Sequence, residues 1–467
     1  MYIFLIEKDA SMNKFSDTGK GKKFRINKLS SAQIIAFGYM VIILVGTLLL
    51  MLPIASKGDA PRFLDAMFTA TSATCVTGLV VYDTYTRWSV FGQAVLLLLI
   101  QTGGLGFMTV ISLAAMATGR KIGLKERSVL QDSVNGMQLA GIVRMARKIA
   151  FGTFFFEGVG AALLAIRFIP KMGLLSGIGN SVFFAISSFC NAGFDLNGKY
   201  GEYSSLTEFA SDPLVCITAC MLVLIGGIGF SVWDDIGKNK LDFSKYRLHS
   251  KIALVFTGVL TLVTVVLFMI FERGYTNAGA GFWQSLLNSF VDSVAPRTAG
   301  FNSVDTAALS PASSVLTIIC MFIGGSPGST AGGVKTVTVA VLILSAIAGM
   351  KNSDDVEIFG RRLEEDVPLK ALTVIAVNLF LAFTGILCIC AFQPELSVKD
   401  VVFECFSAIN TVGMTAGITR DLSQASRIVI MLMMYCGRVG SVSFALIFTR
   451  SKKFTGVHNP VEQVNVG

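Results

Sequence analysis

The chain has 467 residues, 53% of them hydrophobic and only 15% charged, with a formal net charge of +9. A soluble protein of this length would carry more charge, and runs of about 20 apolar residues, the length that a helix needs to cross the hydrocarbon core, recur along the chain. The basic residues gather between these runs, as in cytoplasmic loops, which argues against nucleic-acid binding. Two histidines, and nine cysteines without metal-ligand spacing, argue against a zinc site or a histidine-based catalytic centre. The sequence is that of a multi-pass membrane protein.

A polar, basic tail precedes the first apolar run. Residues 1–31 begin with six apolar residues, too few for the core of a signal peptide. Eight long apolar segments follow, at about residues 32–52, 90–116, 149–168, 214–232, 252–271, 315–347, 371–391 and 428–448. An even number of spans places both termini on one side of the plasma (cell inner) membrane, and the basic tails indicate the cytoplasmic side.

A half-apolar segment of about 35 to 45 residues lies between the two members of each consecutive pair, and the four segments share one pattern. Each has a central glycine, a phenylalanine ten residues before it, a serine six or seven before it, and a bulky apolar residue directly after it. The aligned residues are Gly78, Gly193, Gly300 and Gly413; Phe68, Phe183, Phe290 and Phe403; Ser72, Ser187, Ser293 and Ser407; Leu79, Phe194, Phe301 and Met414. Successive glycines are 115, 107 and 113 residues apart, so a unit of about 110 residues is repeated four times.

A glycine-rich motif in the apolar segment after each aligned glycine is a second landmark. It reads Gly-Gly-Leu-Gly-Phe at 103–107, Gly-Gly-Ile-Gly-Phe at 226–230, Gly-Gly-Ser-Pro-Gly at 324–328 and Gly-Arg-Val-Gly-Ser at 437–441. The second position is glycine in three units and Arg438 in the fourth. This motif supports the repeat independently of the first alignment.

We therefore predict an all-α membrane protein of four tandem helix–pore loop–helix repeats, with eight transmembrane helices and four re-entrant pore loops around a pseudo-four-fold pore. The predicted parts are a cytoplasmic basic N-terminal tail (1–31), pore repeats at 32–118, 149–234, 252–349 and 371–449, cytoplasmic loops at 119–148, 235–251 and 350–370, and a cytoplasmic C-terminal tail (450–467). The third repeat contains a broken helix, because glycine, serine and proline interrupt its second apolar segment.

Re-entrant loops leave backbone carbonyls without helical partners at membrane depth. Such carbonyls are tolerated only where protein buries them or where they line a watery cavity. Four loops around one axis would form a ring of carbonyl oxygens that can replace the hydration shell of a cation. The short helix before each loop would point its partly negative C-terminal end toward the same ring. The repeat therefore indicates a cation pore.

The four aligned segments, the glycine-rich run 324–335 and Arg438 resemble the Trk/Ktr/HKT superfamily of potassium transporters, and in particular its Ktr-type membrane subunit, from about residue 32 to the C-terminus. The resemblance implies potassium uptake through a channel-like gated pore. It implies a potassium-binding selectivity filter formed by Thr74, Cys75, Val76, Thr77, Gly78, Phe189, Cys190, Asn191, Ala192, Gly193, Pro296, Arg297, Thr298, Ala299, Gly300, Asn410, Thr411, Val412 and Gly413. It also implies a gate beneath the filter formed by Gly324, Gly325, Ser326, Pro327, Gly328, Ser329, Thr330, Ala331, Gly332, Gly333, Lys335 and Arg438.

Three positions bear on selectivity and gating. Gly78 resembles the potassium-selective pattern, since superfamily members that pass sodium often have serine there; a sodium-permeable transporter of the same superfamily is the alternative. Arg297 departs from a neutral filter, and we expect its side chain to point outward and hold the loop by hydrogen bonds. Arg438, a cation within an apolar segment, is either an electrostatic barrier in the cation path or a fixed partner of the gating segment, with snorkelling to the interface as the ordinary alternative.

Other functions fit the sequence less well. The run 328–336 nearly matches a phosphate-binding loop, but Val334 separates Gly333 from Lys335 and the run lies within an apolar segment. A membrane enzyme would need a cluster of acids, histidines or thiols on neighbouring helices, and an anion or secondary transporter using Arg297 and Arg438 would call for inverted repeats, whereas these run in one sense. We predict a transporter that is not an enzyme and binds no cofactor, with K+ as substrate and Na+ left open as a stimulating ion.

The predicted surroundings are the lipid bilayer and, by the resemblance, a second copy of the chain and a cytosolic ring of nucleotide-binding regulatory subunits. The basic loops 120–148 and 238–251 and the tail that ends at residue 467 are the predicted docking and dimer surfaces.

Overall fold

The computed structural model describes residues 30–119, 122–133, 141–240, 242–353 and 355–440. Nearly all of the predicted N-terminal tail, the whole C-terminal tail 450–467, and parts of the loop 119–148 lie outside the described residues. The described chain is helical apart from one antiparallel hairpin, β1 (Glu357–Ile358) and β2 (Arg361–Arg362). The all-α fold class predicted from the sequence is confirmed at this level.

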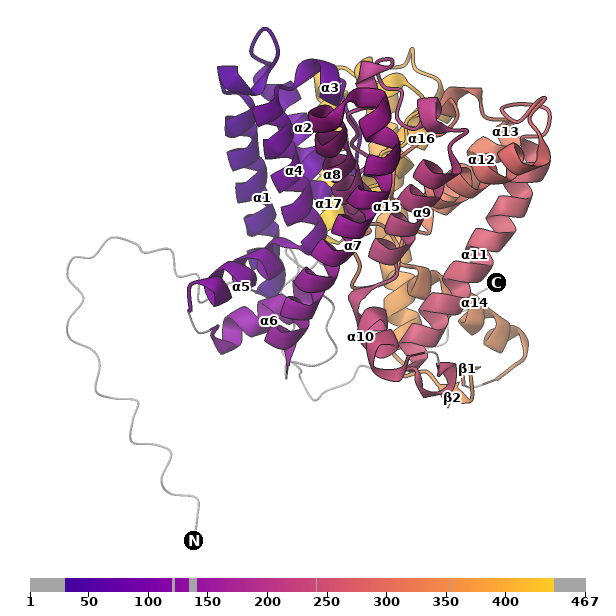
Figure 1. The fold of residues 1–467 in the computed structure, drawn as a ribbon. Coiled ribbons are helices and arrows are strands. Elements are labelled where there is room, and N and C mark those ends of the chain that lie inside the picture. Colours follow the sequence, from indigo (N-terminus) through magenta and orange to yellow (C-terminus); the bar gives the residue numbers. More distant parts are fainter. Residues whose placement is uncertain (1–29, 120–121, 134–140, 241, 354, 441–467) are drawn as a thin grey trace, which may run out of the picture.

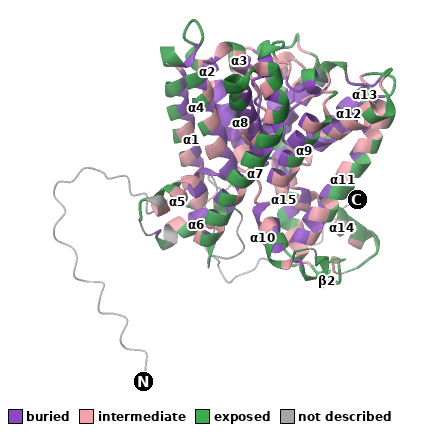
Figure 2. Cartoon of the chain, viewed as in Figure 1, coloured by how far each residue is buried: buried purple, intermediate pink, exposed green. Residues whose placement is uncertain are grey.

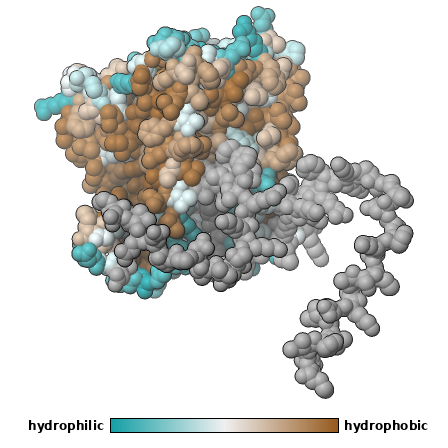
Figure 3. Space-filling view, turned by 180° about the vertical axis from the view of Figure 1, so that it is seen from behind, coloured by the Kyte–Doolittle hydropathy of each residue, from teal (hydrophilic) through white to brown (hydrophobic). Residues whose placement is uncertain are grey.

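Four described helices are long and apolar enough to cross a membrane. They are α1 (Ser31–Leu50), α7 (Ile142–Met172), α11 (Leu248–Phe271) and α15 (Val367–Phe392). Each opens one of the four sequence repeats, called units 1 to 4 below. Their outer faces expose many large apolar side chains, and the molecular surface is apolar over its middle and polar at both ends (Figure 3). This distribution is that of a multi-pass membrane protein.

The second long helix of each unit begins with a side-chain cap. These helices are α4 (Val90–Leu105), α9 (Pro213–Gly227), α13 (Pro311–Phe322) and α17 (Gln424–Val439), and their N-caps are Ser89, Asp212, Ser310 and Ser423. In each case the cap oxygen accepts a hydrogen bond from a backbone N–H of the first turn, which has no partner within the helix. Proline follows the cap in α9 and α13, where its missing N–H costs nothing.

The apolar segments 90–116 and 214–232 each form two helices with a sharp bend between them, a bend that the sequence analysis did not predict. The chain turns by 97° between α4 and α5 (Phe107–Ala117), and by 94° between α9 and α10 (Phe230–Asn239). The residues at the breaks, Gly106 and Gly229, have φ of +79° and +101°, which a right-handed helix excludes and which glycine adopts without steric cost. Both glycines belong to the glycine-rich motif.

The helices of the other two units are also interrupted at this motif, where the fourth position is Pro327 in unit 3 and Gly440 in unit 4. In unit 3 the segment 323–335 separates α13 from α14 (Thr336–Met350), so the break predicted there is present. In unit 4, α17 ends at Val439 and Gly440 has φ of +94°. The part of the predicted span 428–448 beyond Gly440 lies outside the described residues.

Four short helices lie in the interior of the bundle, between the long helices of their units (Figures 1 and 2). They are α2 (Phe63–Cys75), α8 (Leu174–Cys190), α12 (Phe282–Val294) and α16 (Val398–Ile409). The aligned phenylalanines of α2, α8 and α16 are almost fully buried, and Phe290 of α12 is half-buried. Apolar burial of this kind holds each short helix against its unit.

The remaining elements lie at the two ends of the bundle (Figure 1). The lower end in that view holds α5, α6 (Leu124–Ser133), α10 and the hairpin, and the upper end holds α3 (Thr84–Arg87). Short 3-10 turns occur at Pro53–Ala55, Asn197–Lys199, Thr207–Phe209, Phe243–Lys245, Thr306–Ala308 and Ile418–Arg420.

An ion pair joins the first and last units. The guanidinium of Arg427, on α17, lies 2.6 Å from the carboxylate of Asp65, on α2, and the side chains are only 17% and 6% exposed. Tyr82 donates a further hydrogen bond to the same carboxylate at 2.8 Å. Such a pair closes the circle of four units between α2 and α17.

Replacing Arg427 with glutamine should lower the free energy of unfolding by about 3 kcal/mol, because Asp65 would be left buried without its cation. Urea unfolding of the detergent-solubilised protein measures the change. The matched control is Lys370→Gln, which removes one partner of the exposed pair Lys370–Asp366 and should leave the unfolding midpoint in place. Equal effects of the two substitutions would show that the buried pair adds no more to the free energy of unfolding than an exposed pair does.

Candidate functional site

The four aligned glycines meet in one closed ring. A methyl group placed on Gly78 would lie 3.0 Å from Cα of Gly193, and one on Gly193 would lie 3.3 Å from Cα of Gly300. A methyl group on Gly300 would lie 3.3 Å from Cα of Gly413, and one on Gly413 would lie 2.9 Å from Cα of Gly78. Residues separated by more than 100 positions in the sequence are therefore side by side, and only a residue without a side chain fits at each.

Each glycine also lies against a carbonyl oxygen of the next unit. A methyl group on Gly78 would lie 2.6 Å from the carbonyl oxygen of Ala192. One on Gly193 would lie 3.0 Å from the oxygen of Ala299, and one on Gly300 would lie 2.5 Å from the oxygen of Val412. One on Gly413 would overlap the oxygen of Thr77. The four oxygens belong to the residues directly before the glycines, so one backbone carbonyl of every unit lies at the ring.

A shared backbone conformation produces this arrangement. Two residues before each glycine the chain is left-handed, at Val76, Asn191, Thr298 and Thr411, with φ between +51° and +71°. The glycines themselves have φ between +68° and +94°. Left-handed residues are rare outside glycine, and a β-branched one such as Val76 is strained, so four of them at one aligned position indicate a conformation imposed by the surroundings.

Serine hydrogen bonds hold three of the four loops. The hydroxyl of Ser72 accepts from the amide of Gly78 at 3.1 Å, and Ser407 accepts from Gly413 at 3.0 Å. Ser187 accepts from Phe194 at 3.0 Å, one residue later. The third loop differs, because Ser293 is seven residues before its glycine and lies instead 2.5 Å from the hydroxyl of Thr264 on α11.

Arg297 takes part in holding the third loop. Its guanidinium donates to the hydroxyl of Thr261 and to the carbonyl of Thr257 at 3.4 Å, so the side chain is directed at α11. The residue is buried, and Nε has no partner among the described residues. The side chain of Asn191, in the second loop, donates to Thr298 at 3.2 Å and so ties loops 2 and 3 together.

The predicted filter residues thus fall into four loops, at 74–78, 189–193, 296–300 and 410–413, which are called loops 1 to 4. Almost all of these residues are buried, and the bulky side chain after each glycine is at most 4% exposed. Several side-chain oxygens in loops 1 and 4 have no protein partner within the described chain: Thr74, Thr77, Asn410 and Thr411. Buried oxygens without partners are the donor type that a hard, dehydrated cation takes as ligands.

A second set of glycines lets the loops approach the helices behind them. A methyl group on Gly103, Gly226 or Gly437 would overlap the carbonyl oxygen of Thr74, Phe189 or Ile409, respectively. Each of these oxygens belongs to the residue four positions before the ring glycine of its unit. The first glycine of the glycine-rich motif is therefore required for close contact between the second long helix and the C-terminal end of the short helix.

The segment 323–335, which contains the predicted gate residues 324–333 and Lys335, is bonded closely to unit 2. The amide of Ser326 donates to the carbonyl of Gly227 at 2.8 Å, and that of Thr330 to Gly226 at 3.2 Å. The hydroxyl of Thr330 donates to the carbonyl of Phe189, in loop 2, at 3.0 Å.

The same segment also reaches unit 4. A methyl group on Gly332 would overlap the side chain of Thr411, and one on Gly333 would lie 3.0 Å from Cβ of Asn410. Units 2 and 4 are not neighbours in the glycine ring, so the segment crosses from one side of the ring to the other. It closes on itself through the amide of Gly324, which donates to the carbonyl of Val334 at 2.9 Å.

Arg438 connects this segment to two units. Its guanidinium donates to the carbonyl of Thr330 at 2.6 Å and to those of Gly103 and Gly104, the latter at 3.2 Å. Lys335 donates to the carbonyls of Ala331 and Gly332 within the segment, at 2.6 and 3.1 Å. Both terminal nitrogens of the Arg438 guanidinium are thus bonded to backbone carbonyls, one of them within the segment.

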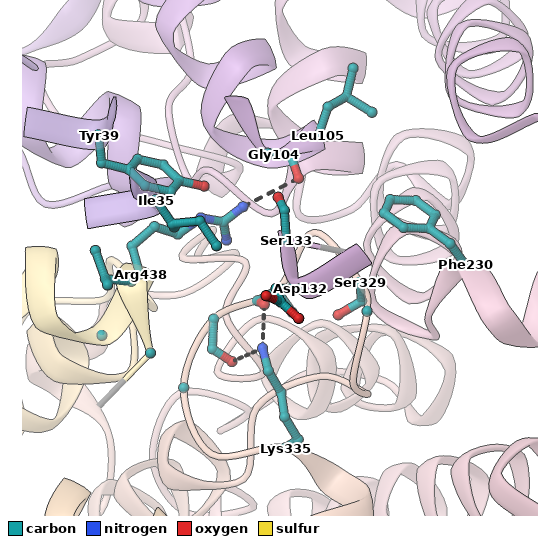
Figure 4. A pocket seen from close by; sticks show the side chains of 18 of the residues that line it. Ile35, Tyr39, Gly104, Leu105, Asp132, Ser133, Phe230, Ser329, Lys335 and Arg438 are labelled. Carbon is teal, nitrogen blue, oxygen red and sulfur yellow. Dashed lines mark hydrogen bonds between the residues drawn. The ribbon is translucent and has the colours of Figure 1, made fainter. Parts of the chain in front are cut away.

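Both cations line a cavity of about 430 Å³ together with the glycines of segment 323–335, α1 and the C-terminal end of α6 (Figure 4). Asp132 and Ser133 of α6 project toward it in the same view. Gly328, Ser329, Gly332 and Gly333 of the segment line this cavity. Thr330, Gly332 and Gly333 contact loops 2 and 4, so the segment touches both the cavity and the loops.

Glu157 was missed by the sequence reasoning. It lies on α7, almost fully buried, and the side-chain amide of Gln101 donates to both its carboxylate oxygens at 3.1 and 3.3 Å. Its carboxylate is also 3.9 Å from the sulfur of Cys190, in loop 2. A lone acid inside the apolar segment 149–168 is a signal that the sequence did contain.

The fold and these loops define a multi-pass membrane protein built of four related units. Residues 10–456 match the TrkH family, described as "Cation transport protein", and the chain belongs to this family. The superfamily resemblance given by the filter and gate motifs is confirmed.

Individual relatives agree with this assignment. The chain is 37% identical to the Ktr system potassium uptake protein B of Bacillus subtilis, over 96% of this chain and 99% of that protein. It is 39% identical to the potassium/sodium uptake protein NtpJ of Enterococcus hirae, over 95% and 99%. The crystal structure of the potassium transporter TrkH from Vibrio parahaemolyticus has a TM-score of 0.72 at 16% identity, and the match covers 92% of this chain and 87% of that one, which establishes the fold.

The glycines behind the loops give a direct test of the geometry. Gly226→Ala should lower the free energy of unfolding by about 1–3 kcal/mol, because the new methyl group must displace the carbonyl of Phe189. Gly158→Ala, on α7 with open space around its Cα, is the control and should be neutral or stabilising by up to about 1 kcal/mol. Chemical denaturation of both variants measures the change in the free energy of unfolding. A Gly226→Ala variant as stable as the parent would mean that α9 is not in tight contact with loop 2.

Proposed function

We propose that this chain is a potassium uptake transporter whose four units enclose a single cation path. The observation that carries the proposal is the ring formed by Gly78, Gly193, Gly300 and Gly413, with one carbonyl oxygen of each unit beside it. Carbonyl oxygens at fixed positions can replace the water around a cation and offer nothing to an anion. The names of the relatives, which specify potassium or potassium/sodium uptake, support the same conclusion.

The proposed architecture has eight membrane crossings, with loops 1 to 4 as the selectivity filter. The short helices α2, α8, α12 and α16 would each direct a partly negative C-terminal end at the filter, which favours a cation there. Thr74 to Gly78, Phe189 to Gly193, Pro296 to Gly300 and Asn410 to Gly413 would line it, and the carbonyls before the glycines would be the principal ligands. Arg297 would support loop 3 from behind, through α11, without entering the ion path.

Segment 323–335 would be the gate. It would lie between the glycine ring and the cavity lined by Lys335 and Arg438. Backbone bonds tie it to unit 2, and Arg438 of unit 4 links its Thr330 to Gly103 and Gly104 of unit 1. Opening would require these bonds to break. The 12 gate residues assigned from the sequence are Gly324 to Gly333, Lys335 and Arg438.

The proposal extends to surroundings and ion coupling. The chain would lie in the plasma membrane with both termini in the cytoplasm, as a homodimer that works with a nucleotide-binding regulatory ring on its basic cytoplasmic surface. Sodium is the second candidate ion, favoured by the potassium/sodium name of the Enterococcus hirae relative, and it would enter either as a second substrate or as a stimulating ion. No catalytic step is part of this function.

Uptake by purified protein in liposomes tests the proposal, with potassium, sodium or chloride as the only permeant ion. Potassium flux above sodium flux, and no chloride flux, is the expected result. Gly78→Ser should reduce the preference for potassium over sodium by about tenfold, because its side chain would displace the Ala192 carbonyl from the ring.

The control for this substitution is Gly58→Ser. Gly58 also has a left-handed backbone, with φ of +104°, but no atom lies within 4 Å of an added methyl group. It should leave selectivity unchanged. Chloride flux in the unaltered protein would overturn the cation pathway, and unaltered selectivity in a folded Gly78→Ser variant would remove loop 1 from the filter.

Arg438→Gln tests the gate. The variant loses charge-assisted hydrogen bonds to Thr330, Gly103 and Gly104, and the loss of even one, worth about 1.5–3 kcal/mol, should weaken the closed arrangement enough to raise potassium flux at least about tenfold. Arg361→Gln, on the exposed hairpin, is the control and should change nothing. Flux that falls, in protein of normal stability, would mean that Arg438 serves conduction and does not hold the gate shut.

A further inference from the structure

A groove runs along the outer surface between α7 and the pair α9–α10. It consists of two cavities of about 640 and 550 Å³, which share the lining residues Phe156, Met221 and Ile225. The walls are almost entirely apolar over this length, with charged residues at the two ends. The larger cavity, nearer α10, is the part discussed below and is called the α7–α10 groove.

The α7–α10 groove opens onto the surface that faces lipid. Phe151, Phe154 and Phe155 of α7 and Met221 of α9 are exposed beside it, as expected of side chains in contact with acyl chains. The groove extends along α7 from Met145 to Phe156, eleven residues or about 17 Å of helix. This length is close to half of a hydrocarbon core of roughly 30 Å, so the groove matches one leaflet.

Within the larger cavity, the α7–α10 groove, charged residues stand only at the end away from the second cavity. Lys148 and Lys238 lie on either side of Asp234, with Lys148 Nζ 3.0 Å from the carboxylate, and their side chains are 61% and 54% exposed. Arg144 and Arg147 are exposed on the same stretch of α7. Two cations therefore share one carboxylate at the groove, which leaves a net positive charge there, and each lysine has further N–H donors beyond its bond to Asp234.

The wall of the groove is rigid and adjoins the proposed ion path. Trp233 is fixed by a hydrogen bond from its indole N–H to the carbonyl of Ile225 at 3.1 Å. Its ring centroid lies 5.3 Å from those of Phe156 and Phe230 and 5.7 Å from that of Phe189. Phe189 belongs to loop 2, and the amide of Phe230 donates to Gly328 of the segment 323–335 at 2.7 Å.

We propose that the α7–α10 groove binds an anionic phospholipid of the cytoplasmic leaflet, with one acyl chain along Phe156, Met221 and Trp233 and the phosphate at Lys148 and Lys238. The apolar groove of one-leaflet length fits the chain, and the excess of positive charge at its end fits the headgroup. The choice of leaflet rests on the orientation proposed above. The ion specificity of the pore does not enter, so this site can fail while the proposed function holds.

Tryptophan quenching by brominated lipid tests the site. The chain has three tryptophans. Trp88 is fully buried and Trp283 is 76% exposed, so Trp283→Phe leaves Trp233 as the residue within reach of lipid. The protein is placed in phosphatidylcholine vesicles that contain a low, increasing fraction of brominated phosphatidylglycerol or, in parallel, brominated phosphatidylcholine. Half-maximal quenching is expected at a fraction about tenfold lower for phosphatidylglycerol.

The variant Lys148→Gln/Lys238→Gln should remove this difference between the two lipids. Lys370→Gln is the matched control, since Lys370 and Asp366 form an exposed pair of the same i,i+4 spacing as Lys238 and Asp234, on another helix. It should preserve the difference. Trp233→Phe should abolish the quenching itself and so confirm which ring is observed.

A measurement on the parent protein keeps the test independent of how the variants fold. Unlabelled phosphatidylglycerol should relieve quenching by its brominated form, and the same fraction of additional phosphatidylcholine should not. Equal quenching by both brominated lipids would mean an ordinary lipid-facing surface and would overturn the proposal. Absence of quenching by either lipid would also overturn it and would point to a second copy of the chain over the groove.

Discussion

The close approach of four backbone loops is the constraint on which the rest of this structure depends. Where Gly78, Gly193, Gly300 and Gly413 meet, a single methyl group would strike the neighbouring unit, and one backbone carbonyl of each unit lies beside the ring. Each loop must therefore be held from outside the ring. Serine hydroxyls, buried anchors such as Phe194 and Phe301, and the helices behind the loops provide that support.

The bends of the second long helices follow from the same requirement. Gly103 and Gly226 allow α4 and α9 to touch the carbonyl ends of α2 and α8, and three residues later Gly106 and Gly229 turn the chain aside. In unit 3 the same motif reads Gly-Gly-Ser-Pro-Gly, and the chain leaves the helix for the whole of segment 323–335. A contact glycine followed by a turn glycine thus produces the bent helices of units 1 and 2, whereas the proline-containing copy in unit 3 lies in the proposed gate.

The repeat and the loops were predictable from the sequence because both consist of identities at fixed spacing. Specific residues at fixed spacing in the sequence mark the aligned glycines, the glycine-rich motif and the broken helix of unit 3. The bends at Gly106 and Gly229 were not predicted, since hydropathy is continuous across them and the turn depends on a φ value that composition does not reveal. The contacts of Asp65 with Arg427, and of Glu157 with Gln101, join residues far apart in the sequence and needed the tertiary structure.

Because one chain supplies all four quarters of the ring, a residue can be used once where a symmetric assembly would be obliged to use it four times. Position 438 is such a case, since glycine stands at the matching place in the other three units. Four arginines there would place four positive charges under the ring and oppose any cation. One arginine adds a single charge, and its guanidinium donates hydrogen bonds to the carbonyls of Thr330, Gly103 and Gly104. Having all four quarters in one chain thus lets this fold keep the glycine ring symmetric while a single unit carries the arginine.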